Sequence, residues 1–156
     1  MTRKTARELA IMLSFASASA GIRSEELAEE FFSEEYFAGL REENELFAEL
    51  PDEKSMSYIR KLIALIEENR SELDGYVERY ASGWRVNRIS RTALAVMRCA
   101  LCEMIYMGLP AGVAINEAVE LAKGYDEPDT VSFVNGVLGG FVRGEREMLE
   151  ALPQEQ

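Results

Sequence analysis

The sequence predicts an all-α protein, and three observations carry that prediction. Apolar residues recur at helical spacing along most of the 156 residues, and no stretch keeps the strict alternation of a half-buried strand. All four prolines fall between the periodic segments, as expected for a residue without the backbone N–H that a helix interior needs. Ser or Asp stands before several segments, where a side-chain oxygen can cap the first N–H groups of a helix.

The sequence predicts about seven or eight helices. In chain order the predicted ranges are 3–19, 24–32, 34–49, 53–69, 71–82, 90–107, 113–124 and 129–150. Ser24, Ser71 and Ser90 are predicted to cap the second, fifth and sixth of them. The fourth and sixth have the strongest apolar faces, made of Tyr58, Ile59, Leu62, Ile63 and Ile66 and of Leu94, Met97, Leu101, Met104 and Ile105.

The last two predicted helices hold the most informative stretch, VAINEAVELAKGYDEPDTVSFVNGVL at 113–138. Val113 begins the apolar side of the first of these helices, and Asp129 is predicted to cap the second. Gly136, Gly139 and Gly140 each weaken a helix by roughly 1 kcal/mol relative to alanine. We therefore expect another backbone to approach closely at these glycines.

Length and composition indicate one domain or two tightly packed subdomains, with enough residues for a real core. No apolar run approaches the ~20 residues that a membrane span needs. The opening Met1-Thr2-Arg3-Lys4 does not have the pattern of a secretory leader. A cytoplasmic protein without a membrane segment is therefore expected.

The net charge of −11 is unevenly distributed. Residues 25–53 hold 12 acids and one base, so this acidic window carries −11 by itself and the rest of the chain is neutral. Within the rest, residues 79–98 contain five arginines and no acid, and residues 1–23 contain four bases and one acid. Local field rather than total charge decides where a polyanion docks, so RNA binding is compatible with this composition.

No catalytic residue, metal site or cofactor is predicted, and the protein is not expected to be an enzyme. Cys99 and Cys102 form a CxxC, but zinc needs about four ligands and the chain has no other cysteine and no histidine. Both thiols are expected in the core. Glu103 is predicted to be a buried, hydrogen-bonded carboxylate. Asn116 and Asn135 are expected to be hydrogen-bonded among apolar neighbours, because unpaired buried amides are costly.

Three segments together resemble the NusB family of bacterial transcription antitermination factors. They are Arg3-Lys4-Thr5-Ala6-Arg7-Glu8, Trp84-Arg85-Val86-Asn87-Arg88-Ile89-Ser90-Arg91, and the 113–138 run with its V-A-I-N-E-A-V-E-L-A-K and F-V-N-G-V-L blocks. The resemblance implies one NusB-like compact helical bundle over 1–156, in two packed subdomains with a boundary near 70–84. It also implies a factor that binds boxA-like single-stranded RNA together with the ribosomal protein NusE, within an RNA polymerase antitermination complex.

The candidate RNA-binding residues are Arg3, Lys4, Arg7, Phe15 and Phe133. The resemblance points to these positions, and the chemistry of the side chains agrees. The three cations share one edge of the first predicted helix and can neutralise phosphates. An exposed aromatic ring can stack on an unpaired base, which is worth ~1–3 kcal/mol. Each phenylalanine also has an alternative interpretation as a core residue.

Arg88, Arg91 and Asp129 are candidate partner-binding residues. For the two arginines, and for Arg98, ion pairs with the acidic window are the favoured alternative. Asp129 is expected to cap a helix first and to touch a partner second. Ala93 stands where relatives carry an acid that helps to hold NusE, so the resemblance does not extend to that ion pair.

Two other functions are considered. A non-catalytic protein-interaction scaffold, possibly a homodimer with weak or lost RNA binding, is suggested by Ala93, by the net charge, and by Thr5 where many relatives have another arginine. The RNA-binding half of an RNA methyltransferase is disfavoured, because no cofactor-binding fold follows in the sequence. Trp84 is interpreted as a packing anchor where two helical units meet.

Overall fold

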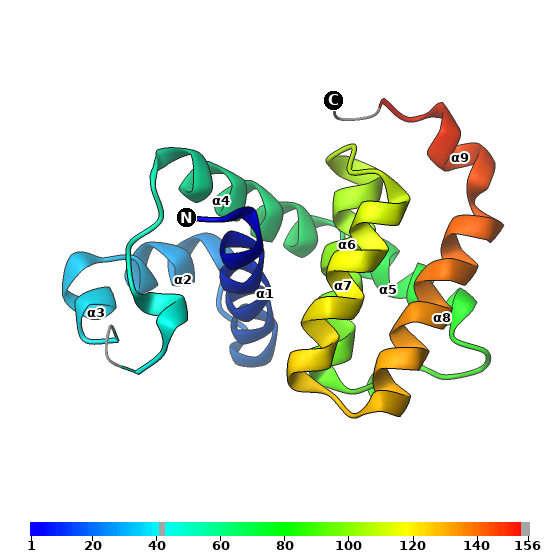
Figure 1. Cartoon of the computed structure of the whole chain (residues 1–156), viewed down its shortest axis with the longest axis horizontal. Helices are drawn as coiled ribbons and strands as arrows, with labels where there is room; N and C mark the ends of the chain where they lie inside the picture. Colours follow the sequence, from blue (N-terminus) through cyan, green and yellow to red (C-terminus); the bar gives the residue numbers. More distant parts are fainter. Residues whose placement is uncertain (41–42, 154–156) are drawn as a thin grey trace. The chain divides into compact units, whose positions relative to one another are not determined.

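The computed structural model describes residues 1–40 and 43–153, and every regular element in these ranges is a helix. The chain divides into two compact units, Met1–Glu68 and Asn69–Gln156 (Figure 1). The all-α fold predicted from the apolar periodicity is therefore confirmed. Within the described ranges, none of the helices is long and apolar enough to cross a membrane.

The first unit is built around two long helices that pack against each other, α1 (Arg3–Ala20) and α4 (Glu53–Glu68), with α2 (Ser24–Phe31) against both. The hydroxyl of Thr2 caps α1 by accepting the N–H of Thr5 at 3.1 Å. The apolar face predicted for the fourth helix is confirmed, because its five residues are buried. The core of this unit includes Leu9, Leu13, Phe37, Tyr58, Ile59, Leu62, Ile63 and Ile66.

The predicted helix at 34–49 is wrong. The structure has a short helix, α3 (Glu34–Ala38), and a 3-10 turn, η1 (Glu45–Phe47), while residues 41–42 of the prediction lie outside the described residues. Ser33 caps the first of these elements and Asn44 caps the second, so each begins anew rather than continuing a helix.

Aromatic packing explains why this segment folds back. The rings of Phe37 and Phe47 lie 6.1 Å apart, and each also packs on Phe31, at 5.7 and 5.9 Å. Ten residues of straight helix would separate Phe37 from Phe47 by about 15 Å along the axis. The chain gains the burial and edge-to-face contacts of these rings only by leaving the helix.

The second unit is built around a central helix. Its elements are α5 (Arg70–Tyr80), η2 (Val86–Arg88), α6 (Arg91–Tyr106), α7 (Ala111–Tyr125), α8 (Pro128–Gly144) and α9 (Arg146–Ala151). Helices α5, α7 and α8 all pack against α6, which carries the largest buried set (Figure 1). Ser90 caps α6 as predicted, accepting the N–H of Ala93 at 3.3 Å. Pro110 and Pro128 stand at the starts of α7 and α8, as expected.

The other predicted caps are wrong. Ser24 is the first residue of α2, and its backbone N–H donates to the carboxylate of Glu67 at 2.6 Å, so an acid from α4 serves that helix start. Ser71 lies one residue inside α5. Asp129 lies in the first turn of α8 and does not cap it, although a carboxylate there still favours the helix dipole.

A tyrosine ring, not a backbone, lies against the glycines at the end of α8. A Cβ on Gly140 would lie 3.4 Å from the ring of Tyr80, and one on Gly144 would lie 2.6 Å from its Cζ. By contrast, a Cβ on Gly136 would have nothing within 4 Å. The predicted close approach of a backbone is therefore wrong, and of the two glycines beside Tyr80 only Gly144 is needed for packing, because 3.4 Å is an ordinary contact distance.

The predicted helix at 129–150 is interrupted at Glu145, between α8 and α9. The hydroxyl of Tyr80 donates to the Glu145 carboxylate, and the guanidinium of Arg79 binds the same carboxylate at 2.9 Å. These two hydrogen bonds, the one from Tyr80 first, lower the pKa of Glu145. The junction is therefore fixed to α5 by a charged residue.

The predicted burial of the two thiols and of Glu103 in α6 is confirmed, whereas the predicted environment of two asparagines in α7 and α8 is wrong. Cys99, Cys102 and Glu103 are buried, and the Cys99 thiol donates to the Glu103 carboxylate at 3.5 Å. Burial, and then the nearby Glu103, raise the pKa of Cys102 to about 12. Asn116 and Asn135 are exposed, contrary to the prediction that they lie among apolar neighbours.

Candidate nucleic-acid interface

The start of α1 presents two cations where helix electrostatics would favour acids. Arg3 and Lys4 occupy the first turn, both side chains are exposed, and no acid lies in that turn. Cations near a helix N-terminus oppose the helix dipole. The same N-terminus attracts anions, so a phosphate would be favoured both by the dipole and by the two side chains.

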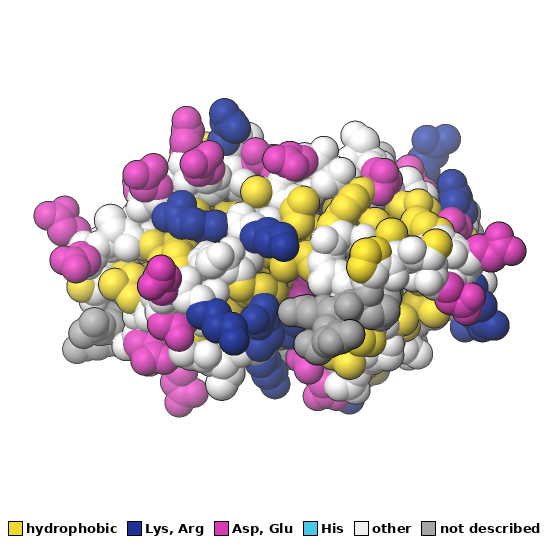
Figure 2. Space-filling model, turned by 90° about the horizontal axis from the view of Figure 1, so that it is seen from above, with side chains coloured by type: hydrophobic (Ala, Val, Ile, Leu, Met, Phe, Trp, Pro, Cys, Tyr) yellow, Lys and Arg dark blue, Asp and Glu magenta, His cyan; other side chains and the backbone are white. Residues whose placement is uncertain are grey.

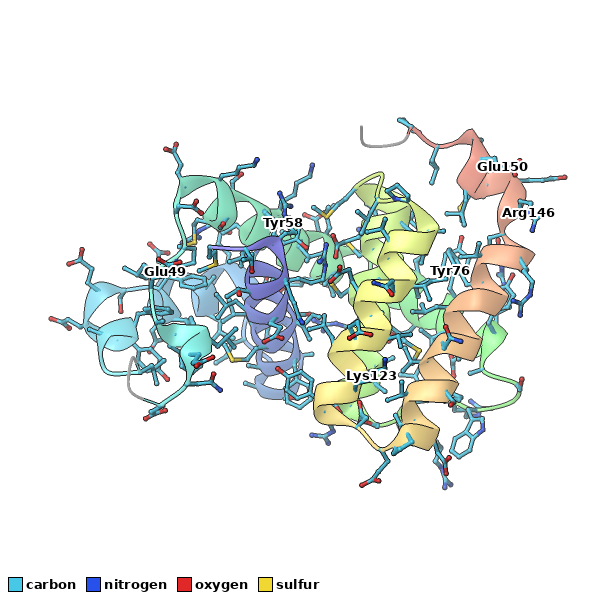
Figure 3. The ribbon with its side chains drawn as sticks, in the orientation of Figure 1. Glu49, Tyr58, Tyr76, Lys123, Arg146 and Glu150 are labelled. Carbon is cyan, nitrogen blue, oxygen red and sulfur yellow. The ribbon has the colours of Figure 1, made fainter. Side chains whose placement is uncertain are left out.

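The two arginines predicted to bind RNA both lie near the ring of Tyr58 in α4, but only Arg3 is exposed. The guanidinium carbon of Arg3 lies 3.9 Å from the centre of the Tyr58 ring, a cation–π contact at the exposed start of α1. Figure 3 marks the position of Tyr58. The corresponding distance for Arg7 is 5.9 Å, but Arg7 is only 5% exposed. Arg7 is therefore largely shielded from solvent, and its predicted contact with RNA stays a prediction.

Lys4 and Phe15 share a stripe of α1. They are 11 residues apart, which is close to three full helical turns, so the two side chains leave the helix in nearly the same direction about 16 Å apart. Lys4 is exposed and Phe15 is partly exposed. The stripe thus places a cation and a partly accessible ring in line along one helix, and these are groups that bind the phosphates and bases of a single strand.

The second unit contains a cavity of about 350 Å³ with aromatic walls. It lies between two segments that are distant in the sequence and is lined by Trp84, Arg88, Ile89, Ser90, Asp129, Thr130 and Phe133. The indole of Trp84 and the ring of Phe133 meet edge to face, with their centres 6.1 Å apart. Three predicted site residues, Arg88, Asp129 and Phe133, are therefore brought together.

Trp84 does not have the role that the sequence suggested. Its side chain is 54% exposed, so the interpretation as a packing anchor is wrong. The chain leaves α5 through Ser82 and Gly83, which have φ values of 52° and 90°, and this left-handed turn carries Trp84 out of the core. Large exposed apolar side chains of this kind usually mark contact sites when they cluster.

Asp126 joins the two walls of the cavity. One oxygen of its carboxylate accepts hydrogen bonds from the hydroxyls of Ser90 and Thr92, each at 3.2 Å. Ser90 lines the cavity on one side, and Asp126 precedes the start of α8 on the other. The link between the walls is therefore made by charge-assisted hydrogen bonds. Sequence reasoning missed Asp126, because nothing in the local pattern relates it to residues more than thirty positions earlier.

The basic 79–98 window is partly neutralised in the fold. Arg79 binds Glu145, and the guanidinium of Arg98 binds the carboxylate of Asp74 through two hydrogen bonds of 2.7 and 2.8 Å. The expected pairing of Arg98 with the acidic window is therefore wrong. Arg88 and Arg91 are exposed. Basic, acidic and hydrophobic side chains are interspersed on the face shown in Figure 2.

Ala93 is fully buried in the first turn of α6. A partner surface at this position must therefore use its neighbours, and exposed Arg91 is two residues away.

The fold and the candidate sites together first indicate a class of protein. This is an all-helical protein whose candidate sites combine cations with accessible aromatic rings, the groups that bind single-stranded nucleic acid. In the described part of the chain, no group of three or more side chains could hold a metal ion.

Comparison with known proteins then gives the family. The model of the NusB family matches residues 4–143. The chain is 37% identical over 150 residues to the transcription antitermination protein NusB of Alkaliphilus oremlandii, covering 96% of this chain and 99% of the relative. It is 34% identical over 145 residues to the same protein of Symbiobacterium thermophilum, covering 92% and 91%. The chain belongs to the NusB family.

Solved structures agree with this assignment. The fold is similar to T. maritima NusB, with a TM-score of 0.76 and 28% identity, over 96% of this chain and 98% of that one. It is also similar, with a TM-score of 0.71 and 22% identity, to a chain in a crystal structure of the antitermination factors NusB and NusE in complex with dsRNA. That match covers 91% of this chain and 96% of the other. At that identity it bears on the fold alone.

Proposed function

We propose that the protein is an antitermination factor that binds a short boxA-like single-stranded RNA together with NusE, within the transcribing RNA polymerase complex. The observation that carries the proposal is the α1 surface of Arg3, Lys4 and Phe15. Two exposed cations can neutralise phosphates, and an accessible ring three turns further along can stack on a base. Membership of a family whose relatives are named antitermination proteins supports the same conclusion.

NusE enters the proposal through the family, since one solved complex of similar fold contains NusB and NusE with dsRNA. On this chain, the exposed Arg91 beside buried Ala93 is the candidate contact. NusE is expected to tighten RNA binding, because linking two weak sites on one complex raises the effective concentration of the second.

The test is a titration of fluorescently labelled boxA RNA, followed by anisotropy, with and without NusE. For single strands the slope of log K against log salt is about −0.7 per phosphate contact. Replacing Arg3 and Lys4 by Ala should therefore make the slope less steep by about 1.4 and weaken binding about tenfold at 0.15 M salt. Absence of binding in both arms would overturn the proposal.

The matched control also removes two exposed cations. Arg23 lies beyond the opposite end of α1, and Lys123 lies on α7, where it pairs with Glu120 at 3.0 Å. The double variant Arg23→Ala, Lys123→Ala has the same net charge as the Arg3, Lys4 variant. The slope of log K against log salt for this control should stay close to that of the unmodified protein. An equal loss of RNA affinity in both double variants would mean that binding depends on total charge only.

A second candidate function is a self-associating scaffold, which one observation favours. Val113 and Tyr125 of α7 are 47% and 56% exposed, and large exposed apolar residues can mark protein contacts. Light scattering over a range of concentrations tests it. A dimer that persists when RNA is added supports the scaffold, and a monomer at all concentrations removes it.

A further inference from the structure

A second cavity, of about 400 Å³, lies near the end of α6, whereas the cavity beside Trp84 adjoins the start of that helix. Its apolar lining consists of Met104, Leu109, Ala111, Val142 and Leu149. Met104 is 1% exposed and the other four are partly exposed, so the opening lies above a buried methionine. A thioether side chain adapts to the shape of what it contacts, and the volume falls within the range of ligand sites. This cavity, here called the α9 groove, can therefore receive an apolar group.

Two breaks in the chain direction hold the walls of the α9 groove apart. After α6 the chain reverses through Gly108, which has a φ of 67°, and α7 begins at Ala111. On the other side α9 begins anew after Glu145, and hydrogen bonds from Tyr80 and Arg79 fix that residue to α5. Helix α9 packs mainly on α8, so the space beside the end of α6 stays open. A groove with fixed walls binds a ligand without ordering loops at the moment of binding.

The α9 edge of the groove carries one cation and one anion, Arg146 and Glu150, both marked in Figure 3. They are four residues apart in the helix, which is about 6 Å along its axis, and both side chains are exposed. A guanidinium only donates hydrogen bonds and a carboxylate only accepts them. The edge therefore complements a ligand that has an anion and, close to it, an N–H group.

The start of α7 adds to the positive side of the groove. Ala111, the first residue of α7, lines the groove, no side chain caps this helix, and its first turn contains no acid. The first N–H groups of a helix attract anions, because they lack partners within the helix and lie at the positive end of its dipole. Here they adjoin a groove that already has an apolar lining and an arginine. A ligand anion is therefore favoured between the start of α7 and Arg146.

We propose that the α9 groove binds the C-terminal residue of a partner protein that ends in a large aliphatic side chain. The side chain enters the apolar lining, the terminal carboxylate contacts Arg146 and the start of α7, and the last backbone N–H donates to Glu150. This inference goes beyond RNA binding. It adds a protein-docking site in the second unit that uses none of the candidate RNA-binding residues.

Glu150 decides between a peptide and a free fatty acid. Both ligands combine an apolar body with a carboxylate, which suits the lining and Arg146. An ionised fatty acid has no hydrogen-bond donor, so Glu150 would meet it only as a like charge. A peptide has a backbone N–H beside its terminal carboxylate, and Glu150 can accept that hydrogen bond. The charges at the edge of the groove therefore favour the end of a peptide.

The test uses two fluorescein-labelled peptides of the sequence Gly-Ser-Gly-Ala-Ile-Leu, one with a free C-terminal carboxylate and one with a C-terminal amide. Each is titrated with the full chain, and binding is followed by anisotropy. The carboxylate peptide should bind about 2- to 30-fold more tightly, because only its charge interacts with Arg146 and the helix start. The ε-methyl NMR signal of Met104 should shift as this peptide binds, whereas that of Met12 in α1 should not.

Variants assign the preference for the carboxylate to one side chain. Arg146→Ala should reduce that preference about 1.4- to 5-fold and leave the amide peptide unaffected. Arg143→Ala is the matched control, since Arg143 is an exposed arginine near the end of α8 and outside the groove lining, so the preference should not change. Glu150→Gln should strengthen the binding of decanoate, because it removes the like charge. The double variant Arg3→Ala, Lys4→Ala should bind the peptide as the unmodified chain does.

Three results would overturn the proposal. If neither peptide binds at up to about 1 mM, or the amide binds as tightly as the carboxylate, the groove does not hold a C-terminus. If a peptide binds and the Met104 signal does not move, the binding lies elsewhere. If decanoate displaces the carboxylate peptide and binds the unmodified chain more tightly, the ligand is a free fatty acid. Failure of the RNA titration leaves this inference standing, and failure of the peptide titration leaves the proposed RNA binding standing.

Discussion

Gly144 and Gly136 are predicted to respond to alanine with opposite signs. Both lie in α8, where alanine is favoured over glycine by up to about 1 kcal/mol. At Gly136 the new methyl group meets nothing within 4 Å, so the full gain is expected and the protein should be stabilised by about 0.5–1 kcal/mol. At Gly144 the same methyl group would lie 2.6 Å from Cζ of Tyr80.

The ring of Tyr80 cannot move away at little cost. It packs edge to face on Phe141 at 6.1 Å, and its hydroxyl donates to Glu145 at the α8–α9 junction. Overpacking of this kind costs about 1–3 kcal/mol, which exceeds the gain in helix propensity. Gly144→Ala should therefore lower the free energy of unfolding by about 1–2 kcal/mol.

Urea unfolding followed by far-UV circular dichroism measures both effects. The mechanism is isolated by repeating Gly144→Ala in a Tyr80→Ala background, where the methyl group has no ring to displace. There the substitution should become neutral or stabilising. A penalty that persists without Tyr80, or a Gly144→Ala protein as stable as the Gly136→Ala protein, would refute the packing argument.

Three further predictions concern the α5 and α6 helices. Asp74→Ala removes the carboxylate that binds the guanidinium of Arg98, a side chain that is only 13% exposed. The free energy of unfolding measured in urea should fall by about 1–3 kcal/mol. A change within experimental error would contradict this prediction. Cys99 and Cys102 should resist alkylation by iodoacetamide in the native protein and react on unfolding. Because the pKa of Cys102 is raised, the folded state keeps a proton that the unfolded state loses, so the free energy of unfolding should fall above about pH 9. Cys102→Ala should lessen that fall. An unchanged fall would contradict the attribution to Cys102.

The helices could be predicted wherever one apolar face dominates. The faces of α4 and α6 were readable because each repeats over four turns and is almost wholly buried. The structure of the segment after α2 could not be predicted from periodicity. Contacts among the rings of Phe31, Phe37 and Phe47 stabilise a folded-back chain, and a periodic pattern does not contain these contacts. The cap at Ser24 failed for the same reason, since Glu67 from another helix takes that role.

The candidate site was predictable in its residue types and not in their placement. The basic start and the aromatic at Phe133 were visible in the sequence, and the structure brings Phe133 together with Arg88 and Asp129. Burial of Arg7 could not be foreseen, because helical spacing places it beside Arg3. The exposure of Trp84 did have a signal, the Ser82-Gly83 pair that breaks the chain direction before it.

The central claim is that the protein recognises unpaired RNA by stacking and phosphate contact together. The most direct measurement compares its affinity for a single-stranded boxA RNA with its affinity for the same strand annealed to its complement, at one salt concentration. A duplex carries the higher charge density, so binding by charge alone would favour it. We predict that the single strand binds more tightly, because only its bases can reach the aromatic rings. Equal or tighter binding of the duplex would contradict that claim.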